Sequence, residues 1–253
     1  MSFNQAEVEL LGSSALLRGL PAADLQVVLR AGRAHALPDG AFFFLEADPA
    51  EKAFILLHGK VKLGQVTEVG QQVILGYIIP GRVFGVISVI QNMVYPVSAQ
   101  AVGECRALWW DQSTLNRLMD ASPRIGLNAM RIMAGQIREF QNTIRDLSTK
   151  RVEQRIARAV LRLARQSGRK TEAGILIDLP LTRQDLAEMT GTTLYTVSRV
   201  LNDWEAQGLV QSQRQRVVIC SAHGLVDIGE DLPTLMEDEG KILGDALEES
   251  GQR

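Results

Sequence analysis

The stretch LTRQDLAEMTGTTLYTVSRVLNDWEAQGL, from Leu181 to Leu209, limits the possible folds more than any other part of the chain. It predicts two short helices separated by a Gly-Thr-Thr turn. Thr182 is a typical N-cap residue, and Asp185 three positions later can complete the cap. Gly191 can end the first helix in the left-handed conformation without a steric penalty. The spacing therefore predicts a helical pair with a tight, defined turn.

The second helix of this pair has one apolar and one polar face. Val197, Leu201 and Trp204 recur at helical spacing and should face inward, as should Leu186 and Met189 of the first helix. The outer face then carries Tyr195, Thr196, Ser198, Arg199 and Asn202. An ordinary helical hairpin is the alternative, but its solvent face would more often carry Glu and Lys. The pattern favours a helix-turn-helix whose second helix enters the major groove of DNA.

Composition is typical of a soluble globular protein, with 46% hydrophobic and 22% charged residues in 253. No run of about 18 apolar residues exists, and the start MSFNQAEVELL lacks a secretory pattern, so we expect no membrane association. Cys105 and Cys220 are the only cysteines and lie far apart. They favour a cytoplasmic protein and argue against a disulfide framework, a zinc site or an iron–sulfur cluster.

The net charge of −2 is unevenly distributed. Residues 227–253 hold nine acidic and two basic residues, so the rest of the chain has 25 bases and 20 acids. Bases are concentrated between Arg145 and Lys170, just before the helix-turn-helix. Phosphates respond to local charge rather than to the total, so the overall balance is compatible with DNA binding.

The fold class we expect is α+β, with a first domain over residues 1–122. Residues 3–33 look helical, and Pro21 can open the second helix of that part. From about 34 to 111, short apolar runs alternate with Gly59, Gly70 and Gly81, eleven residues apart. Regular turn signals at this spacing predict a small β-roll, and a jelly-roll of about eight strands is the simplest closure.

Residues 123–148 predict one long helix with a dimerisation seam. Two rows of apolar residues repeat every seven positions: Met130, Ile137 and Ile144 in one row, and Met133, Phe140 and Leu147 in the other. Two interleaved heptad rows favour a parallel homodimer, since paired helix-turn-helices need a two-fold axis to read two half-sites. The alternative is a helix that packs only on its own domain.

Residues 149–226 predict a winged helix-turn-helix domain. A basic helix over 150–168 precedes a short hairpin, GILIDLPL, and the recognition helix precedes a second hairpin, GLVQSQRQRVVIC. Arg214 and Arg216 lie at the tip of this second hairpin, where a wing can contact phosphate. Residues 227–253 form an acidic tail with an amphipathic pattern. The tail either docks on the body or stays partly disordered.

A β-roll, a long dimer helix and a winged helix-turn-helix, in this order, resemble the CRP/FNR family of transcription regulators over residues 10–222. LTRQDLAEMTGTT is the most specific part of the resemblance. Within the family, GTTLYTVSR, KVKLGQVTEVGQQVILGYIIPG and YPVSA look like the nitric-oxide-responsive Nnr/Dnr-type branch, which controls denitrification genes. The resemblance implies an activator of transcription that binds a palindromic double-stranded operator as a homodimer, with RNA polymerase as a partner.

The resemblance also implies DNA-contact residues: Arg183, Gln184, Thr193, Tyr195, Thr196, Ser198, Arg199, Arg214 and Arg216. Arg199 is in register with an arginine that family members use on a guanine. Tyr195 replaces a Glu that reads cytosine in relatives, so the half-site preference should differ there. The effector pocket implied by the family is lined by Phe84, Gly85, Val86, Tyr95, Pro96, Met130 and Met133.

The sequence departs from the cyclic-nucleotide members of the family. Val86 follows Gly85 where those members have Glu, and Pro96 or Val97 stands where they have Arg. An apolar residue cannot neutralise a buried phosphate, so cyclic AMP is not expected as the effector. Oxygen-sensing members hold an iron–sulfur cluster through an N-terminal cysteine group, which this sequence lacks before Cys105. The remaining expectation is an apolar cavity between the roll and the long helix, which would suit haem or a hydrophobic effector.

The haem ligands available are His35, His58, Met130 and Met133, and each also has an ordinary structural interpretation; His223 lies beyond the wing. No phosphate loop, metal-ligand spacing or nucleophile motif indicates an enzyme. Three alternatives stay open: an effector-independent dimeric DNA-binding protein, a family member that answers to another small apolar effector, and a redox sensor that uses Cys105.

Overall fold

The computed structural model describes residues 3–68 and 70–230, and its first elements are two short helices. Helix α1 (Gln5–Ser13) begins at Asn4, whose side chain caps the helix together with Glu7. Helix α2 (Ala22–Ala31) begins after Pro21, as expected. Leu11, Leu16 and Leu17 are buried against the β-roll. None of the helices in the described ranges is both long and apolar enough to cross a membrane.

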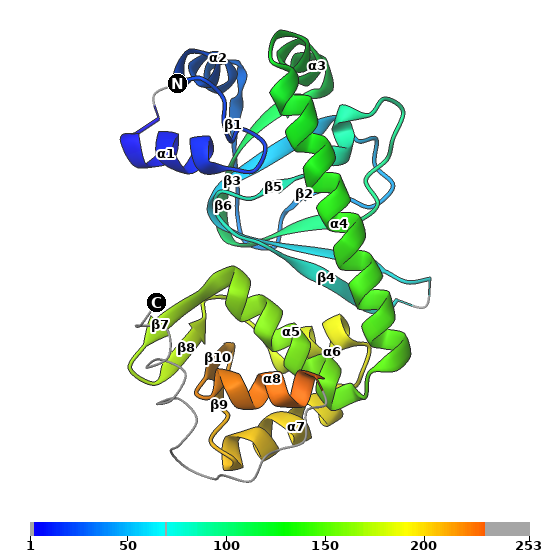
Figure 1. Ribbon diagram of the computed structural model, residues 1–253. Coiled ribbons are helices and arrows are strands. Elements are labelled where there is room, and N and C mark those ends of the chain that lie inside the picture. Colours follow the sequence, from blue (N-terminus) through cyan, green and yellow to red (C-terminus); the bar gives the residue numbers. More distant parts are fainter. Residues whose placement is uncertain (1–2, 69, 231–253) are drawn as a thin grey trace, which may run out of the picture.

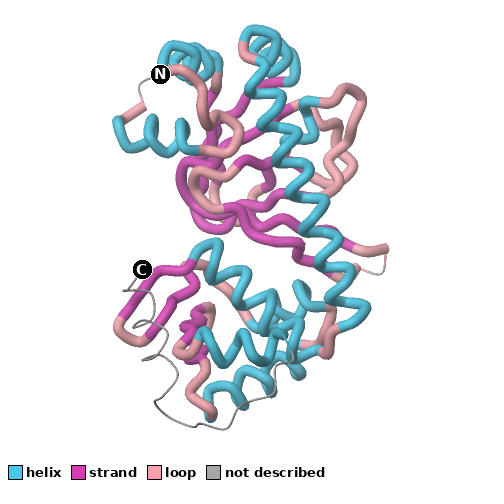
Figure 2. Tube along the Cα trace, in the orientation of Figure 1, coloured by secondary structure: helices cyan, strands magenta, loops and turns pink. Residues whose placement is uncertain are grey.

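The β-roll is one antiparallel sheet with the strand order β1-β6-β3-β4; β2 pairs with β6 and β5 pairs with β3. Its elements are β1 (Arg33–Leu37), β2 (Phe42–Phe44), β3 (Lys52–Val66), β4 (Gln72–Ile78), β5 (Val83–Phe84), the short 3-10 helix η1 (Val86–Val89) and β6 (Ser98–Asp111). Figures 1 and 2 show these strands curling around one another above the C-terminal domain.

The roll contains six strands in its described residues rather than about eight, because β3 and β6 each run through a bend. Their pairing shifts register twice between Leu56 and Lys60, which makes an irregular bulge between the two strands. Gly59 lies at this bulge with φ of 86° and not in a turn between strands, which corrects the sequence interpretation. A Cβ at Gly59 would collide with the backbone of Glu104, so only glycine allows this close approach.

Helix α3 (Gln112–Ala121) leads into the long helix α4 (Pro123–Thr149), which runs from the roll to the C-terminal domain (Figure 1). The first half of α4 packs on its own domain: Ile125 and Ala129 are buried, and the Asn128 side chain donates hydrogen bonds to the carbonyls of Leu16 (2.9 Å) and Arg18 (3.0 Å). The alternative of a helix packed on its own domain therefore describes this half.

The C-terminal domain joins helices to a four-stranded sheet. It consists of α5 (Val152–Ser167), β7 (Gly168–Thr171), β8 (Gly174–Ile177), α6 (Arg183–Thr190), α7 (Leu194–Ala206), β9 (Val210–Gln213), β10 (Arg216–Ile219) and α8 (Ala222–Glu230). The first hairpin pairs β7 with β8, so GILI is its second strand and DLPL follows as a loop, which corrects the expected hairpin. Both hairpins share one sheet of order β7-β8-β10-β9.

Helix α8 continues past the expected domain boundary at residue 226. It packs on α5, with Leu225 fully buried and Gly229 so close to α5 that an added Cβ would meet Arg158 and Ala157. Residues 227–230 thus belong to the C-terminal domain. The remainder of the acidic tail, residues 231–253, lies outside the described residues.

Candidate nucleic-acid interface

Local hydrogen bonds fix the helix-turn-helix formed by α6 and α7. The Thr182 side chain accepts from the Asp185 backbone NH, and the Asp185 carboxylate accepts from the Thr182 backbone NH (2.8 Å), which completes the expected capping box. Gly191 ends α6 in the left-handed region, with φ of 60° and ψ of 46°. Thr193 then caps α7 by accepting from the Thr196 NH. These bonds fix both ends of α6 and the start of α7 through contacts within a few residues.

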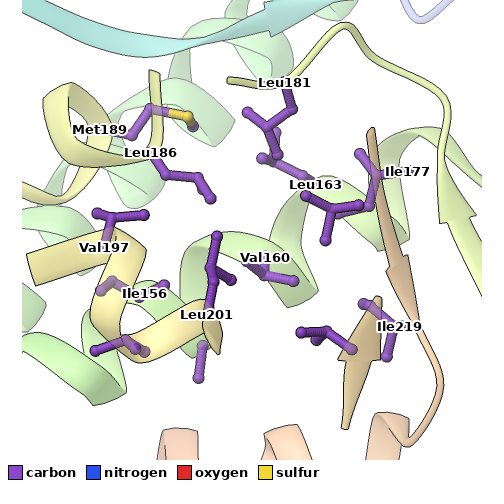
Figure 3. Close-up of a cluster of buried hydrophobic side chains, with 14 of the residues drawn as sticks. Ile156, Val160, Leu163, Ile177, Leu181, Leu186, Met189, Val197, Leu201 and Ile219 are labelled. Carbon is purple, nitrogen blue, oxygen red and sulfur yellow. The ribbon is translucent and has the colours of Figure 1, made fainter. Parts of the chain in front are cut away.

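The inner face of α7 anchors it to the rest of the domain. Val197, Leu201 and Trp204 are fully buried, as the sequence predicted, and Figure 3 shows Val197 and Leu201 facing Ile156 and Val160 of α5. The Trp204 ring NH donates to the Glu153 carboxylate (3.0 Å), so this deeply buried ring has a polar partner. The anchored inner face leaves the opposite face of α7 free.

The outer face of α7 exposes the residues expected to read DNA. Tyr195 is 79% exposed and Arg199 is exposed, while Thr196 and Ser198 are half-buried. The exposed Thr193 belongs to the same edge, and its hydroxyl lies 2.9 Å from that of Thr196. Five of the expected contact residues are therefore on one continuous surface.

Two expected contact residues on α6 have partners within the protein. Arg183 donates to Asn202 Oδ1 (2.9 Å) and to Ser212 Oγ (3.1 Å), which ties α6 to α7 and β9. The Gln184 amide donates to Glu188 on the same helix (2.8 Å). Sequence reasoning missed the bridging role of Arg183, because its two partners are 19 and 29 residues away in the chain.

The second hairpin has the form expected of a wing. Arg214 and Gln215 make its two-residue turn, and Gln215 has φ of 60°. Arg214 and Arg216 are exposed and, like Arg199, form no hydrogen bond or ion pair with any residue that the structure describes. Three unpaired guanidinium groups on the recognition helix and wing provide the positive charge that a phosphate backbone requires.

Two family profiles match the chain in the same order as these domains. Residues 34–122 match the cyclic nucleotide-binding domain, and residues 154–228 match the Crp-like helix-turn-helix domain. The chain belongs to the CRP/FNR family. It is a DNA-binding transcription regulator of that type and not an enzyme.

Individual relatives agree with the CRP/FNR assignment. The chain is 25% identical over 217 residues to a CRP-like cAMP-activated global transcriptional regulator of Mycobacterium tuberculosis, covering 86% of this chain and 97% of that one. It is 28% identical over 187 residues to the transcriptional activator protein anr of Pseudomonas aeruginosa, covering 74% and 76%. FixK2 from Bradyrhizobium japonicum shares the fold, with a TM-score of 0.69 at 22% identity over 78% of this chain and 96% of that chain.

The region that was expected to bind an effector is packed with side chains of the protein itself. Phe84, Val86 and Tyr95 are buried; the Phe44 and Tyr95 rings stack with centroids 3.7 Å apart, and Tyr95 Oη donates to the Lys52 carbonyl (2.7 Å). Burial is the largest cause that raises the pKa of Tyr95 to about 12. The expected pocket residues are not brought together around one space, since Pro96 and Met130 are exposed and Met133 packs on the roll core.

The chain around η1 contains no positively charged side chain. Residues 83–103 contain no charged side chain, Gly85 is left-handed, and Val86 is buried at the start of η1. A cyclic phosphate placed here would lose its hydration without gaining a positively charged partner. That this member does not use cyclic AMP stays a prediction.

The histidines do not form a haem site in this structure. His35 and His58 are exposed, on β1 and β3, and His223 is exposed at the start of α8, 3.6 Å from Asp227. His58 lies inside β3 rather than before a turn, which corrects its expected position. Axial ligation of a haem buried in the roll needs a buried ligand, and these three exposed side chains do not provide one.

Polar contacts join the roll to the first helix of the helix-turn-helix. Lys62 Nζ lies 3.9 Å from Asp185 Oδ1, and Lys60 Nζ lies 3.2 Å from Asp178 Oδ1. Burial and the nearby Asp185 carboxylate raise the pKa of Tyr77, whose ring packs in the C-terminal core. The capping carboxylate of α6 is thus also a contact point for the roll. A cavity of about 740 Å³ lies beside these contacts, lined in part by Lys62, Tyr77, Asp185 and Arg216.

Replacing Lys62 by methionine should loosen this contact. The pair is an ion pair rather than a hydrogen bond, and both side chains are largely buried, so its loss should cost at most about 1 kcal/mol of docking free energy. Amide hydrogen exchange in β4 and in the first turn of α6 should become about fivefold faster. Lys170→Met, on exposed β7, is the matched control. Unchanged exchange at both positions would show that the contact does not couple the domains.

Proposed function

We propose that this protein is a homodimer that reads a palindromic operator with α7 and controls transcription in answer to a signal received by the roll. The exposed Arg199 of α7 and the exposed Arg214 and Arg216 of the wing, which pair with no described residue, are the observation that carries the DNA-reading role. The second half of α4 supports the homodimer. Its seam side chains are exposed in the single chain, with Ile137 at 57% and Ile144 at 64%, and such a continuous apolar row normally has a partner.

The signal that we propose is small and uncharged, because residues 83–103 offer no anchor for an anion. Nitric oxide, with nitrogen-oxide respiration genes as targets and RNA polymerase as partner, is the specific proposal from the sequence resemblance. Haem is not included as a step, because His35, His58 and His223 are exposed and none is buried in the roll. The proposed domains are residues 1–122, 123–148 and 149–230, with 231–253 as the tail.

Measuring operator affinity in the presence of added ligands tests which kind of signal the roll receives. Cyclic AMP at 1 mM should change operator affinity by less than about twofold, because its phosphate would be unpaired in the roll. Absorption spectra of the anaerobically purified, haem-reconstituted protein, with and without nitric oxide, test haem independently. A cyclic AMP effect of tenfold or more would refute the uncharged-signal proposal, and a haem spectrum that responds to nitric oxide would refute our conclusion that haem does not fit.

An effector-independent dimer is a second candidate, and the ring cluster that fills the roll favours it. Phe54 and Phe84 stack with centroids 4.9 Å apart, so a ligand must displace them or bind elsewhere. The discriminating result is operator affinity that no small molecule changes, in a protein that still binds its operator specifically.

A further inference from the structure

The end of the described chain places an acidic segment beside the DNA-binding domain. Helix α8 ends at Glu230, whose carboxylate pairs with Arg158; Arg158 Nε also donates to Asp146 at the end of α4 (3.0 Å). The next residues, 231–253, contain seven acidic and two basic side chains. They lie beyond residue 228, where the match to the helix-turn-helix profile ends, so the family relationship assigns them no role.

The same domain also carries exposed, positively charged side chains that could attract this acidic segment. We define the reading face as Leu194, Tyr195 and Arg199 of α7 with Arg214 and Arg216 of the wing. Leu194 is 48% exposed beside the still more exposed Tyr195, and the three guanidinium groups have no partner among the described residues. The reading face therefore combines apolar side chains with three unpaired positive charges.

The segment 231–253 complements the reading face both in charge and in apolar side chains. Its acids can pair with the arginines, and its apolar residues can cover Leu194 and Tyr195; these apolar residues are Leu232, Leu235, Met236, Ile242, Leu243 and Leu247. Twenty-three residues span up to roughly 75 Å when extended, whereas a domain of about 80 residues is roughly 30 Å across. The segment is long enough to reach the reading face from Glu230.

We propose that residues 231–253 dock on the reading face and compete with DNA for it, an inference that rests on the proposed DNA-reading role of that face. A segment tethered this closely has an effective concentration of about 1 mM. If it binds its own domain with a dissociation constant of about 100 μM, DNA affinity is lowered about tenfold. The competition weakens as salt rises, because the attraction between the segment and the face is electrostatic.

The first test compares the full chain with a variant in which the seven acids are replaced by their amides: Asp231, Glu237, Asp238, Glu239, Asp245, Glu248 and Glu249. Fluorescence anisotropy with a random-sequence duplex should show about tenfold tighter binding by the variant near 0.1 M salt, with the gap closing near 0.5 M. Equal affinities within twofold would overturn the docking proposal and leave the proposed function intact. No DNA binding by either protein would overturn both.

The second test separates docking from simple repulsion between the segment and DNA. A fluorescein-labelled peptide of residues 231–253 should bind the neutralised full-length variant, and DNA should displace it. Combining Arg199→Ala, Arg214→Ala and Arg216→Ala should lower peptide affinity at least tenfold. The control, Arg165→Ala with Arg169→Ala and Lys170→Ala, removes three exposed positive charges elsewhere in the domain and should change peptide affinity less than threefold. No peptide binding, or equal losses in both triple variants, would show that the segment does not dock on the reading face.

Discussion

Replacing Ile137 by glutamate should convert the dimer to monomers. Ile137 lies at the centre of the exposed apolar row on α4, so a parallel partner helix would place the two Ile137 side chains against each other. Two glutamates there would bury uncompensated like charges, at a cost of several kcal/mol. Light scattering at micromolar concentration should give the mass of one chain, and operator affinity should fall because a monomer reads only one half-site.

The matched control for this change is Asn142→Glu, on the face of α4 opposite the seam. Asn142 is exposed and accepts a hydrogen bond from Arg145, so a carboxylate there gains a cationic neighbour. The control should remain dimeric. An Ile137→Glu protein that also remained dimeric would refute the proposed seam and would favour a helix that packs only on its own domain.

Replacing Arg199 by alanine should remove sequence discrimination. The guanidinium is exposed on α7 and has no partner among the described residues, so it can make a bidentate contact with guanine that is worth about 1–3 kcal/mol. With two half-sites, the ratio of operator affinity to random-DNA affinity should fall by at least tenfold. Competition binding with operator and random duplexes measures this ratio directly.

The wing arginines provide the contrast for Arg199. Arg214→Ala or Arg216→Ala should weaken operator and random DNA by similar factors, since a wing on the phosphate backbone carries no sequence information. If Arg199→Ala lowered the affinity for operator and for random DNA equally, Arg199 would also contact phosphate rather than a base. Tyr195 should alter the preferred base at its position relative to family members that carry Glu.

Local chemistry made the helix-turn-helix predictable from sequence. Thr182, Asp185 and Gly191 act through hydrogen bonds within a few residues, and Val197, Leu201 and Trp204 follow a helical period that any buried face imposes. These features do not depend on the rest of the fold, so the sequence alone defines them.

Features that depend on distant parts of the chain were not predictable in the same way. The bulge at Gly59 depends on the close approach of Glu104, and the bridge from Arg183 depends on Asn202 and Ser212. The first hairpin was misplaced because GRKT has no alternating pattern, and its pairing with GILI is visible only once the sheet is formed. A pocket was expected between the roll and the long helix, whereas the packing of five aromatic rings within the roll was not foreseen: Phe43, Phe44, Phe54, Phe84 and Tyr95.

Selection of bound sequences from a random pool of duplex DNA tests the central claim most directly. If two copies of α7 related by a two-fold axis read DNA, the enriched sequences should form an inverted repeat with half-sites about 10 base pairs apart, centre to centre. The Arg199→Ala protein should enrich no such repeat. Enrichment of no sequence by the unaltered protein, or of a single asymmetric site, would contradict a dimeric, sequence-specific regulator.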